Sequence, residues 1–453
     1  GRGRGQRHSI DRIIIGYKTT KAERIVYSFI HSLIDWVGFF FFLLKITISI
    51  GIPLLFGHHQ SIDLRHQRTN DLLTASTQQD ERESSSIIME SSSNNNIREL
   101  FRSNKPQIVA DDIFGDCVSQ VGSDDVLELT KCVTQGLQTD ELARNLDLQN
   151  FLFVIAGALV FMLQIGFAMV CAGNVRVKNV QNTMLKNLLD ACGSAIAFWL
   201  VGFAFAFGGQ DKSGGKGFIG TENFFNIGDS PAYWFFQYTL SSTAVTIVAG
   251  TLAERCQMAA YLLYSIVVAG LIYPVVAHSI WSNNGFLSPT TDNPFLDVGV
   301  LDFGGGSVVH VTGGVVALIA SSILGPRNGR FYDERGEPLD RPKPFPGHSI
   351  ALQLLGTMIL WFGWLGYNPG SALVLDVTDV GVVASKAAVN TALCGAMGGI
   401  TALFTKLWLE ERRTGEPSFD LRACMNGSLS GLVASTAGCA LMESWGAVVT
   451  GSI

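Results

Sequence analysis

The sequence predicts an all-α polytopic membrane protein, and three observations lead to that prediction. Charged residues make up only 15% of the 453 residues, against about a quarter in soluble proteins. After residue 147, windows without Asp, Glu, Lys or Arg recur, and the shortest has 19 residues. A helix needs roughly 20 apolar residues to cross the hydrocarbon core. Several windows are also rich in Gly, Ala and Ser, which let helix backbones approach closely in lipid.

Eight such windows follow one another, and each predicts one membrane span. Three of them contain a histidine, but none contains a residue that is charged at neutral pH. The windows cover residues 148–175, 191–210, 230–253, 256–291, 303–326, 344–375, 387–405 and 423–442.

Basic residues predict how the spans are oriented, because short cytoplasmic loops are enriched in Lys and Arg. The loops after spans two, four and six hold only Lys212, Lys216 and Lys386. The distribution therefore places the start of the first span outside. The loops after spans one, three, five and seven hold Arg176, Lys178, Lys186, Arg255, Arg327, Arg330, Arg335, Arg341, Lys343, Lys406, Arg412, Arg413 and Arg422.

The chain divides into three predicted regions. Residues 1–88 include an apolar stretch, 27–56, that two charged residues interrupt, each costing about 3 kcal/mol at mid-bilayer. This region is either a non-native leader or one extra apolar segment. Residues 89–147 begin as a polar tract and are predicted to be a linker and an outside segment. Residues 148–453 form the membrane domain, which we expect to be incomplete because the sequence stops within an apolar segment.

The eight cysteines fall into two groups. Six lie at or within predicted spans, where a small buried hydrophobic residue is the ordinary interpretation. Cys117 and Cys132 lie in the predicted outside segment, where oxidising conditions permit a disulfide. Whether they form one is left open by the sequence.

Motifs of enzymes and of other site classes are not found. The sequence has no HExxH and no GxSxG, and the glycine-rich stretch 208–220 lacks P-loop spacing. We therefore expect no enzyme and no cofactor. Histidines and cysteines without paired spacing argue against a metal site. The net charge of −6 says little about a membrane protein, and we expect no nucleic-acid partner.

His310 is the most informative residue of the spans. It lies in LDFGGGSVVHVTGG, residues 301–314, about 10 Å along the helix from the start of its window. An ionisable residue inside a membrane is a functional hypothesis by default, although a hydrogen bond to a neighbouring helix is the alternative. His278 is predicted to be an interfacial or packing residue, and His348 a surface residue.

Aromatic residues flank this span in the sequence. One interpretation of Trp281, Trp361, Trp364 and Tyr367 is an aromatic belt at the membrane interface. In the other, some of them face a vestibule and attract a small cation through the ring quadrupole, at about 0.5 to 2 kcal/mol. The hydroxyl of Ser371 would then accept a hydrogen bond from that cation.

Four motifs together resemble the ammonium transporter family, over about residues 148–442. Each is weak alone, but they occur in the family's order and are separated by the predicted spans. They are GNVRVKNV (173–180), LAERCQ (252–257), LDFGGGSVVHVTGG (301–314) and WFGWLGYNPGSA (361–372).

The resemblance implies a helical bundle with an inverted repeat, of which about eight of eleven spans are present. It also implies a homotrimer in the plasma membrane, with ammonium and methylammonium as substrates and the lipid bilayer as surroundings. Trp281 and Ser371 would form the outer ammonium site, which Asp302 would shape and make favourable for a cation.

Below that site, the resemblance places Tyr367 at a gate and Trp364 beside the pore. Leu240 stands at a gate position where the family usually has phenylalanine, which weakens the aromatic gate. His310 would be the first of two pore histidines, and the second belongs to a span beyond Ile453.

The implied function is transport. A bare ion in a low-dielectric pore is costly, so the ammonium would be deprotonated and ammonia would pass along the histidine-lined path. A neutral histidine suits such a path because it both donates and accepts a hydrogen bond. An ammonium sensor, or a non-conducting subunit of the same family, is the alternative.

Overall fold

The computed structural model describes residues 107–121, 125–209, 217–226, 230–291, 293–333, 335, 337–374 and 379–453. The predictions for residues 1–88, and for residues 89–106 of the linker, lie outside these ranges. The chain divides into two compact units at Asp140 and Glu141. Each is described by itself.

The first unit contains a disulfide. Helix α5 (Gln107–Val121) and the first part of helix α6 (Val126–Asn174) are joined by Cys117 and Cys132, whose Cα atoms lie 5.8 Å apart. The prediction had left this bond open, and the structure contains it. The side chains buried beside it are those of Leu129 and Val133, with Ile113, Phe114, Val118 and Leu137 packed against them.

The second unit is a bundle of helices, and the described residues form no β-strand. Three segments, η2, η4 and η6, are π-helical turns that continue into α-helices. After α6 the elements are η1 (Val177–Asn179), α7 (Val180–Ala197), η2 (Phe198–Gly202), α8 (Phe203–Phe207), η3 (Phe224–Asn226), α9 (Pro231–Leu252), α10 (Met258–Val267), η4 (Val268–Ile272), α11 (Tyr273–Trp281), η5 (Phe295–Asp297), η6 (Gly306–Val311), α12 (Thr312–Leu324), α13 (Ile350–Gly370), η7 (Ser371–Val374), α14 (Val380–Thr414), α15 (Leu421–Thr436) and α16 (Ser444–Ser452).

Six of the eight predicted spans are confirmed as helices long and apolar enough to cross a membrane, counted over the described residues. The other two, α9 and α15, do not meet this criterion. Helix α15 has only 16 residues. The six stretches are Val126–Asn174, Val177–Phe207, Ala260–Trp281, Gly306–Leu324, Ile350–Val374 and Val380–Thr414.

Helix α9 is a continuous helix of 22 residues, and its polar composition explains why it does not meet the criterion. It packs against α7 and α12 inside the bundle, so its polar side chains face protein rather than lipid. Inside a membrane, hydroxyl groups bond to the helix's own carbonyls or to neighbouring helices. The buried polar side chains of α9 are those of Gln237, Thr239, Ser241, Ser242, Thr243 and Thr246.

Side-chain caps explain where several helices begin. The Ser230 hydroxyl accepts a hydrogen bond from the Tyr233 amide at the start of α9, and Pro231 occupies the first turn. Ser349 caps α13, and the carboxylate of Asp420 accepts two backbone N–H groups at the start of α15. Such caps satisfy amides that lack an intrahelical partner.

The fourth predicted span was too long. Its helix ends at Trp281, whereas the charge-free window extends to residue 291. The sequence SNNG after Trp281 is rich in turn formers, and the chain folds back so that the Leu287 amide donates to the Ser279 carbonyl at 2.9 Å. Polar turn residues therefore end this helix before any charged residue does.

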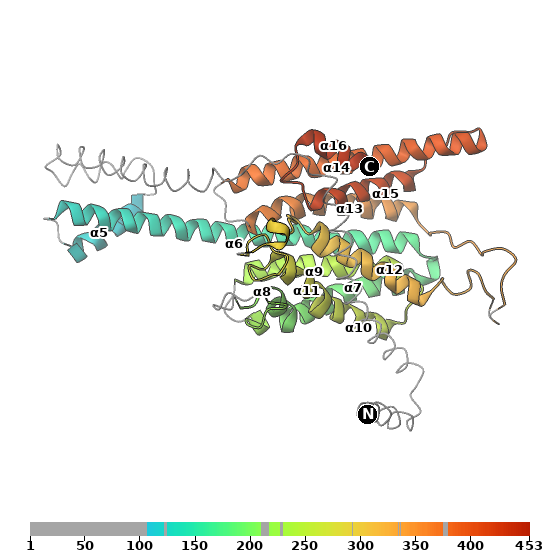
Figure 1. The fold of residues 1–453 in the computed structure, drawn as a ribbon, viewed down its shortest axis with the longest axis horizontal. Helices are drawn as coiled ribbons and strands as arrows, with labels where there is room; N and C mark the ends of the chain where they lie inside the picture. The colour runs from blue at the N-terminus through green and yellow to red at the C-terminus, as the bar shows by residue number, and fades with distance from the viewer. Residues whose placement is uncertain are drawn as a thin grey trace, which may run out of the picture. The chain divides into compact units, whose positions relative to one another are not determined.

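The C-terminal helices pack closely. Helix α14 lies against α13, α15 and α16, which Figure 1 shows in orange and red. At Gly398 of α14, an added Cβ would lie 2.2 Å from the Gly427 carbonyl oxygen of α15. Only glycine permits this approach of the two backbones.

Candidate functional site

A cavity of about 740 Å³ lies beside the end of α11. Four of the residues predicted to form the site line it: Trp281, Asp302, Ser371 and Leu240. They come from α11, the segment before η6, η7 and α9, so the fold brings together residues that are far apart in sequence. We call this cavity the aromatic vestibule, because Phe153, Phe207, Tyr233, Phe236 and Phe303 also line it.

Trp281 is fixed at the wall of the vestibule by one hydrogen bond. Its indole Nε1 donates to the backbone carbonyl of Asp302 at 2.7 Å. The indole has no other polar group, so the faces of its ring remain for contact with a ligand. Sequence reasoning placed Trp281 at this site, and the structure adds the bond that orients it.

Asp302 caps the helix that carries His310. Its carboxylate is buried and accepts four backbone N–H groups at the N-terminus of η6, at 2.7 to 2.9 Å. These four amides begin the helix and lack an intrahelical partner. Burial raises the pKa of the Asp302 carboxyl group above its ordinary value, and the four amides offset that rise only in part. The direct effect of the carboxylate is on the position of η6. The donors are the amides of Gly305, Gly306, Ser307 and Val308.

His310 lies in a stack of rings that we call the histidine stack, with Trp364 and Tyr367 of α13. The centroid of the imidazole lies 5.4 Å from that of Trp364 and 5.8 Å from that of Tyr367. All three side chains are buried. Neither ring nitrogen of His310 has a hydrogen-bond partner among the residues that the structure describes.

The histidine stack adjoins the aromatic vestibule at Gly305. A Cβ added there would lie 3.0 Å from the Tyr367 hydroxyl and 3.1 Å from the Trp281 ring. Gly305 has a φ of +98°, which side-chain-bearing residues rarely adopt. Glycine is therefore required at this position both by the backbone and by the space between the two aromatic residues.

Polar contacts with α14 and α15 fix the orientation of α13. The Trp364 Nε1 donates to the Thr436 hydroxyl at 3.1 Å. The Asn368 amide donates to the hydroxyls of Thr391 and Ser435, at 2.8 and 3.2 Å. The Ser371 hydroxyl donates to the Tyr367 carbonyl, which directs the oxygen lone pairs of Ser371 elsewhere.

Sequence reasoning missed several residues of the vestibule. Phe236 lies one turn before Leu240 on α9, and Phe153 of α6 lies 5.6 Å from it between ring centroids. Gln237 also lines the cavity, and its side-chain oxygen has no partner in the described chain. The only signal was their place in apolar windows, which these residues share with many packing residues.

The other two histidines of the described residues lie outside this site. His278 is buried, and its Nδ1 lies 3.0 Å from the Ala206 carbonyl. His348 is exposed, with its Nδ1 3.2 Å from the Ala172 carbonyl. The described residues contain no group of three His, Cys, Asp or Glu side chains that could hold a metal ion.

The LAERCQ motif lies at the other end of the spans. Glu254 is buried there, and it accepts hydrogen bonds from Arg176 at 2.8 Å, Arg327 at 3.0 Å, and Asn179. Burial alone would raise the pKa of Glu254. The hydrogen bonds from Arg176 and Asn179 and the charge of Arg327 outweigh burial and lower that pKa below its ordinary value of 4.5.

Comparison with known proteins identifies the family. The profile of the Ammonium Transporter Family matches residues 150–453, about two thirds of the chain. The chain belongs to this family. Within the Ammonium Transporter Family, it is 42% identical over 300 residues to Ammonium transporter 3 of Dictyostelium discoideum, covering 66% of this chain and 64% of that protein.

Two further relatives agree. Ammonium transporter Amt2 of Archaeoglobus fulgidus is 43% identical over 307 residues, covering 66% of this chain and 61% of that protein. The solved structure of a Sensor Amt Protein superimposes with a TM-score of 0.57 at 30% identity, covering 68% of this chain and 72% of that one. The chain thus spans less than two thirds of the length of the Dictyostelium discoideum and Archaeoglobus fulgidus transporters.

Proposed function

We propose that this chain carries ammonium and methylammonium across a membrane. One observation supports this most directly: the aromatic vestibule and the histidine stack meet at Gly305. A wide cavity with cation-attracting groups therefore adjoins a buried, apolar environment that contains an imidazole. The names of the curated relatives, all ammonium transporters, support the same substrate.

Recruitment of the cation would use Trp281 and Ser371. A cation over the indole face gains about 0.5 to 2 kcal/mol. The Ser371 hydroxyl donates its hydrogen bond to the Tyr367 carbonyl, so the lone pairs of its oxygen can accept an N–H of ammonium. Asp302 would contribute by holding both the Trp281 indole and the start of η6 in place.

Passage beyond the vestibule would require loss of a proton. Burying an unpaired ion costs several kcal/mol or more, which exceeds the return from one cation–π contact. Ammonia is neutral and does not carry this cost. His310 has two ring nitrogens without partners in the described residues, so it can bond to ammonia along the path. Tyr367 would form the gate, and Leu240, in place of an aromatic residue, would give a less aromatic entrance.

The test is uptake of radiolabelled methylammonium in cells that lack their own ammonium uptake. We expect His310→Asp to abolish uptake or to change the transported species, while the protein still reaches the membrane. His348→Asp is the matched control, because His348 lies outside the site, and we expect it to retain uptake. Unaltered uptake kinetics in His310→Asp would contradict the proposed role of the histidine.

A sensor is the second candidate, favoured by the structural likeness to a Sensor Amt Protein. It would bind ammonium at the vestibule with the same residues but move no net substrate. Binding of methylammonium without accumulation in cells would favour the sensor, or the non-conducting subunit. Accumulation would favour the transporter.

We further propose a homotrimer in the plasma membrane, with the disulfide-containing segment outside. The basic loops support this orientation, and so does the Cys117–Cys132 disulfide, which forms in oxidising compartments. Accessibility of an epitope inserted after Val121, between α5 and α6, on intact cells tests the orientation, and cross-linking of purified protein tests the trimer.

A further inference from the structure

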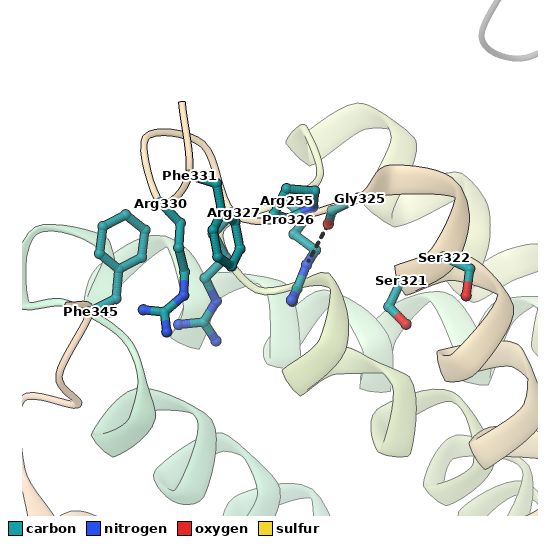
Figure 2. Close-up of a pocket in the computed structure, with 9 residues that line it drawn as sticks. All are labelled: Arg255, Ser321, Ser322, Gly325, Pro326, Arg327, Arg330, Phe331 and Phe345. Carbon is teal, nitrogen blue, oxygen red and sulfur yellow. Dashed lines mark hydrogen bonds between the residues drawn. The ribbon is translucent and has the colours of Figure 1, made fainter. Parts of the chain in front are cut away.

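A second cavity, of about 640 Å³, lies after α12 and is lined by three arginines. We call it the arginine pocket. Arg255, Arg327 and Arg330 contribute their side chains, and Figure 2 shows them extending in the same direction beside Phe345. None of the residues that line this described pocket is acidic.

The charges at the arginine pocket are not balanced. The buried carboxylate of Glu254 pairs with Arg327 and with Arg176, which lies outside the pocket. Among the residues that the structure describes, Arg255 donates hydrogen bonds to the carbonyls of Thr251 and Gly325, and Arg330 donates one to the carbonyl of Lys343. Neither Arg255 nor Arg330 pairs with a carboxylate of the described residues, so positive charge is in excess among the described residues around the pocket.

The surroundings of Arg255 support the same conclusion. Its burial, followed by the positive charge of Arg327, lowers the pKa of Arg255 below its ordinary value. The guanidinium stays charged at neutral pH, but its charged form is less well stabilised than in water. A bound anion would restore that stabilisation.

The pocket also adjoins an apolar surface. Ser321 and Ser322, at the end of α12, line it, while Leu318, Ile323 and Leu324 of the same helix end are exposed. Both serine hydroxyls donate to the Leu318 carbonyl, so we do not assign them to a ligand. A ligand that is anionic at one end and apolar at the other matches this combination.

We propose that the arginine pocket binds the phosphomonoester headgroup of a membrane lipid, with its acyl chains along the exposed face of α12. A phosphomonoester carries a charge of about −1.5 to −2 at pH 7. Arginine forms paired hydrogen bonds with phosphate oxygens, and basic pockets at the ends of spans accept anionic headgroups. Arg255 and Arg330 are the residues that bind the phosphate. Arg327 also lines the pocket, but it already pairs with Glu254 and contributes less.

The experiment measures binding of dioctanoyl phosphatidic acid to the purified protein in detergent by native mass spectrometry. Dioctanoyl phosphatidylcholine has the same chains with a zwitterionic headgroup, and glycerol 3-phosphate has the same phosphomonoester without chains. We expect phosphatidic acid to bind at least tenfold more tightly than either. Equal binding of phosphatidylcholine would overturn the proposal. Equal binding of glycerol 3-phosphate would support the phosphate site but overturn its assignment to a lipid.

Variants locate the binding. We expect Arg330→Gln to weaken binding of phosphatidic acid about tenfold, which corresponds to about 1.4 kcal/mol, close to one hydrogen bond with a charged group. Arg341→Gln removes the same charge from the same loop but does not line the pocket, and we expect it to bind as the wild type does. Equal losses in the two variants would overturn the proposal. Arg330→Lys keeps the charge without the paired geometry and should bind at an intermediate level, which keeps the test informative if Arg330→Gln does not fold.

Discussion

Asp302→Asn separates two roles that the buried carboxylate could have, which are capping the start of η6 and attracting the cation. In the structure, each carboxylate oxygen accepts two backbone N–H groups at the N-terminus of η6. Asparagine keeps one acceptor oxygen and places an NH₂ group where the other was, so two of the four bonds are lost. Hydrogen bonds to a charged group contribute about 1.5 kcal/mol or more each. We therefore expect Asp302→Asn to lower the free energy of unfolding by about 3 kcal/mol.

Thermal unfolding of the detergent-solubilised protein measures this effect, and uptake of methylammonium is measured on the same variant. Asp420→Asn is the control, because Asp420 caps α15 through a single oxygen that asparagine retains. Asparagine and aspartate cap helices about equally well, so we expect a change of less than about 1 kcal/mol. If Asp302→Asn left stability unchanged but abolished uptake, Asp302 would act mainly by attracting the cation, and the cap would be a secondary role.

Three other changes test the remaining features. Gly305→Ala should lower the free energy of unfolding by about 1 to 2 kcal/mol through backbone strain alone, and it should reduce uptake by moving Trp281. Gly314→Ala is the control, because an added Cβ there meets nothing within 4 Å. We expect it to be tolerated in the same melting and uptake assays. Reducing the Cys117–Cys132 disulfide, which closes a loop of 15 residues, should destabilise the first unit by about 3 kcal/mol. Faster proteolysis of residues 107–140 would show this loss, and unchanged proteolysis would count against it. Because the pKa of Glu254 is lowered on folding, its contribution to stability should be complete above pH 4.5 and be lost as the pH falls through the lower folded value. Melting curves against pH, with and without Glu254→Gln, measure that loss, and identical curves would contradict it.

Charge-free windows predicted the spans because a buried charge in lipid is costly. Six of the eight predicted spans are helices long and apolar enough to cross a membrane, counted over the described residues. The window for α14 was too short at both ends, since the helix begins at Val380, before residue 387, and continues past residue 405 to Thr414. Lys406 and Glu410 pair four residues apart on that extension, which allows a helix to continue in water. Hydropathy reports the surroundings of a helix and does not report where its backbone hydrogen bonds end.

The candidate site was predicted in part. Trp281, Ser371 and Asp302 were assigned to one place, and the structure brings them to one cavity. The resemblance supplied that assignment, because nothing in local spacing joins residues 281 and 371. The cap at Asp302 was not predicted, although an acidic residue before GGGS is consistent with one. Phe236 could not be found without the packing of α9 against its neighbours.

Glu254 joins segments that are far apart in the sequence. One carboxylate binds Arg176 after α6 and Arg327 after α12, while Glu254 itself lies between α9 and α10. Displacing any one of these three segments would break bonds that orient the other two. The three segments are therefore expected to move together, so that a displacement at one of them also shifts the ends of the spans beside the other two.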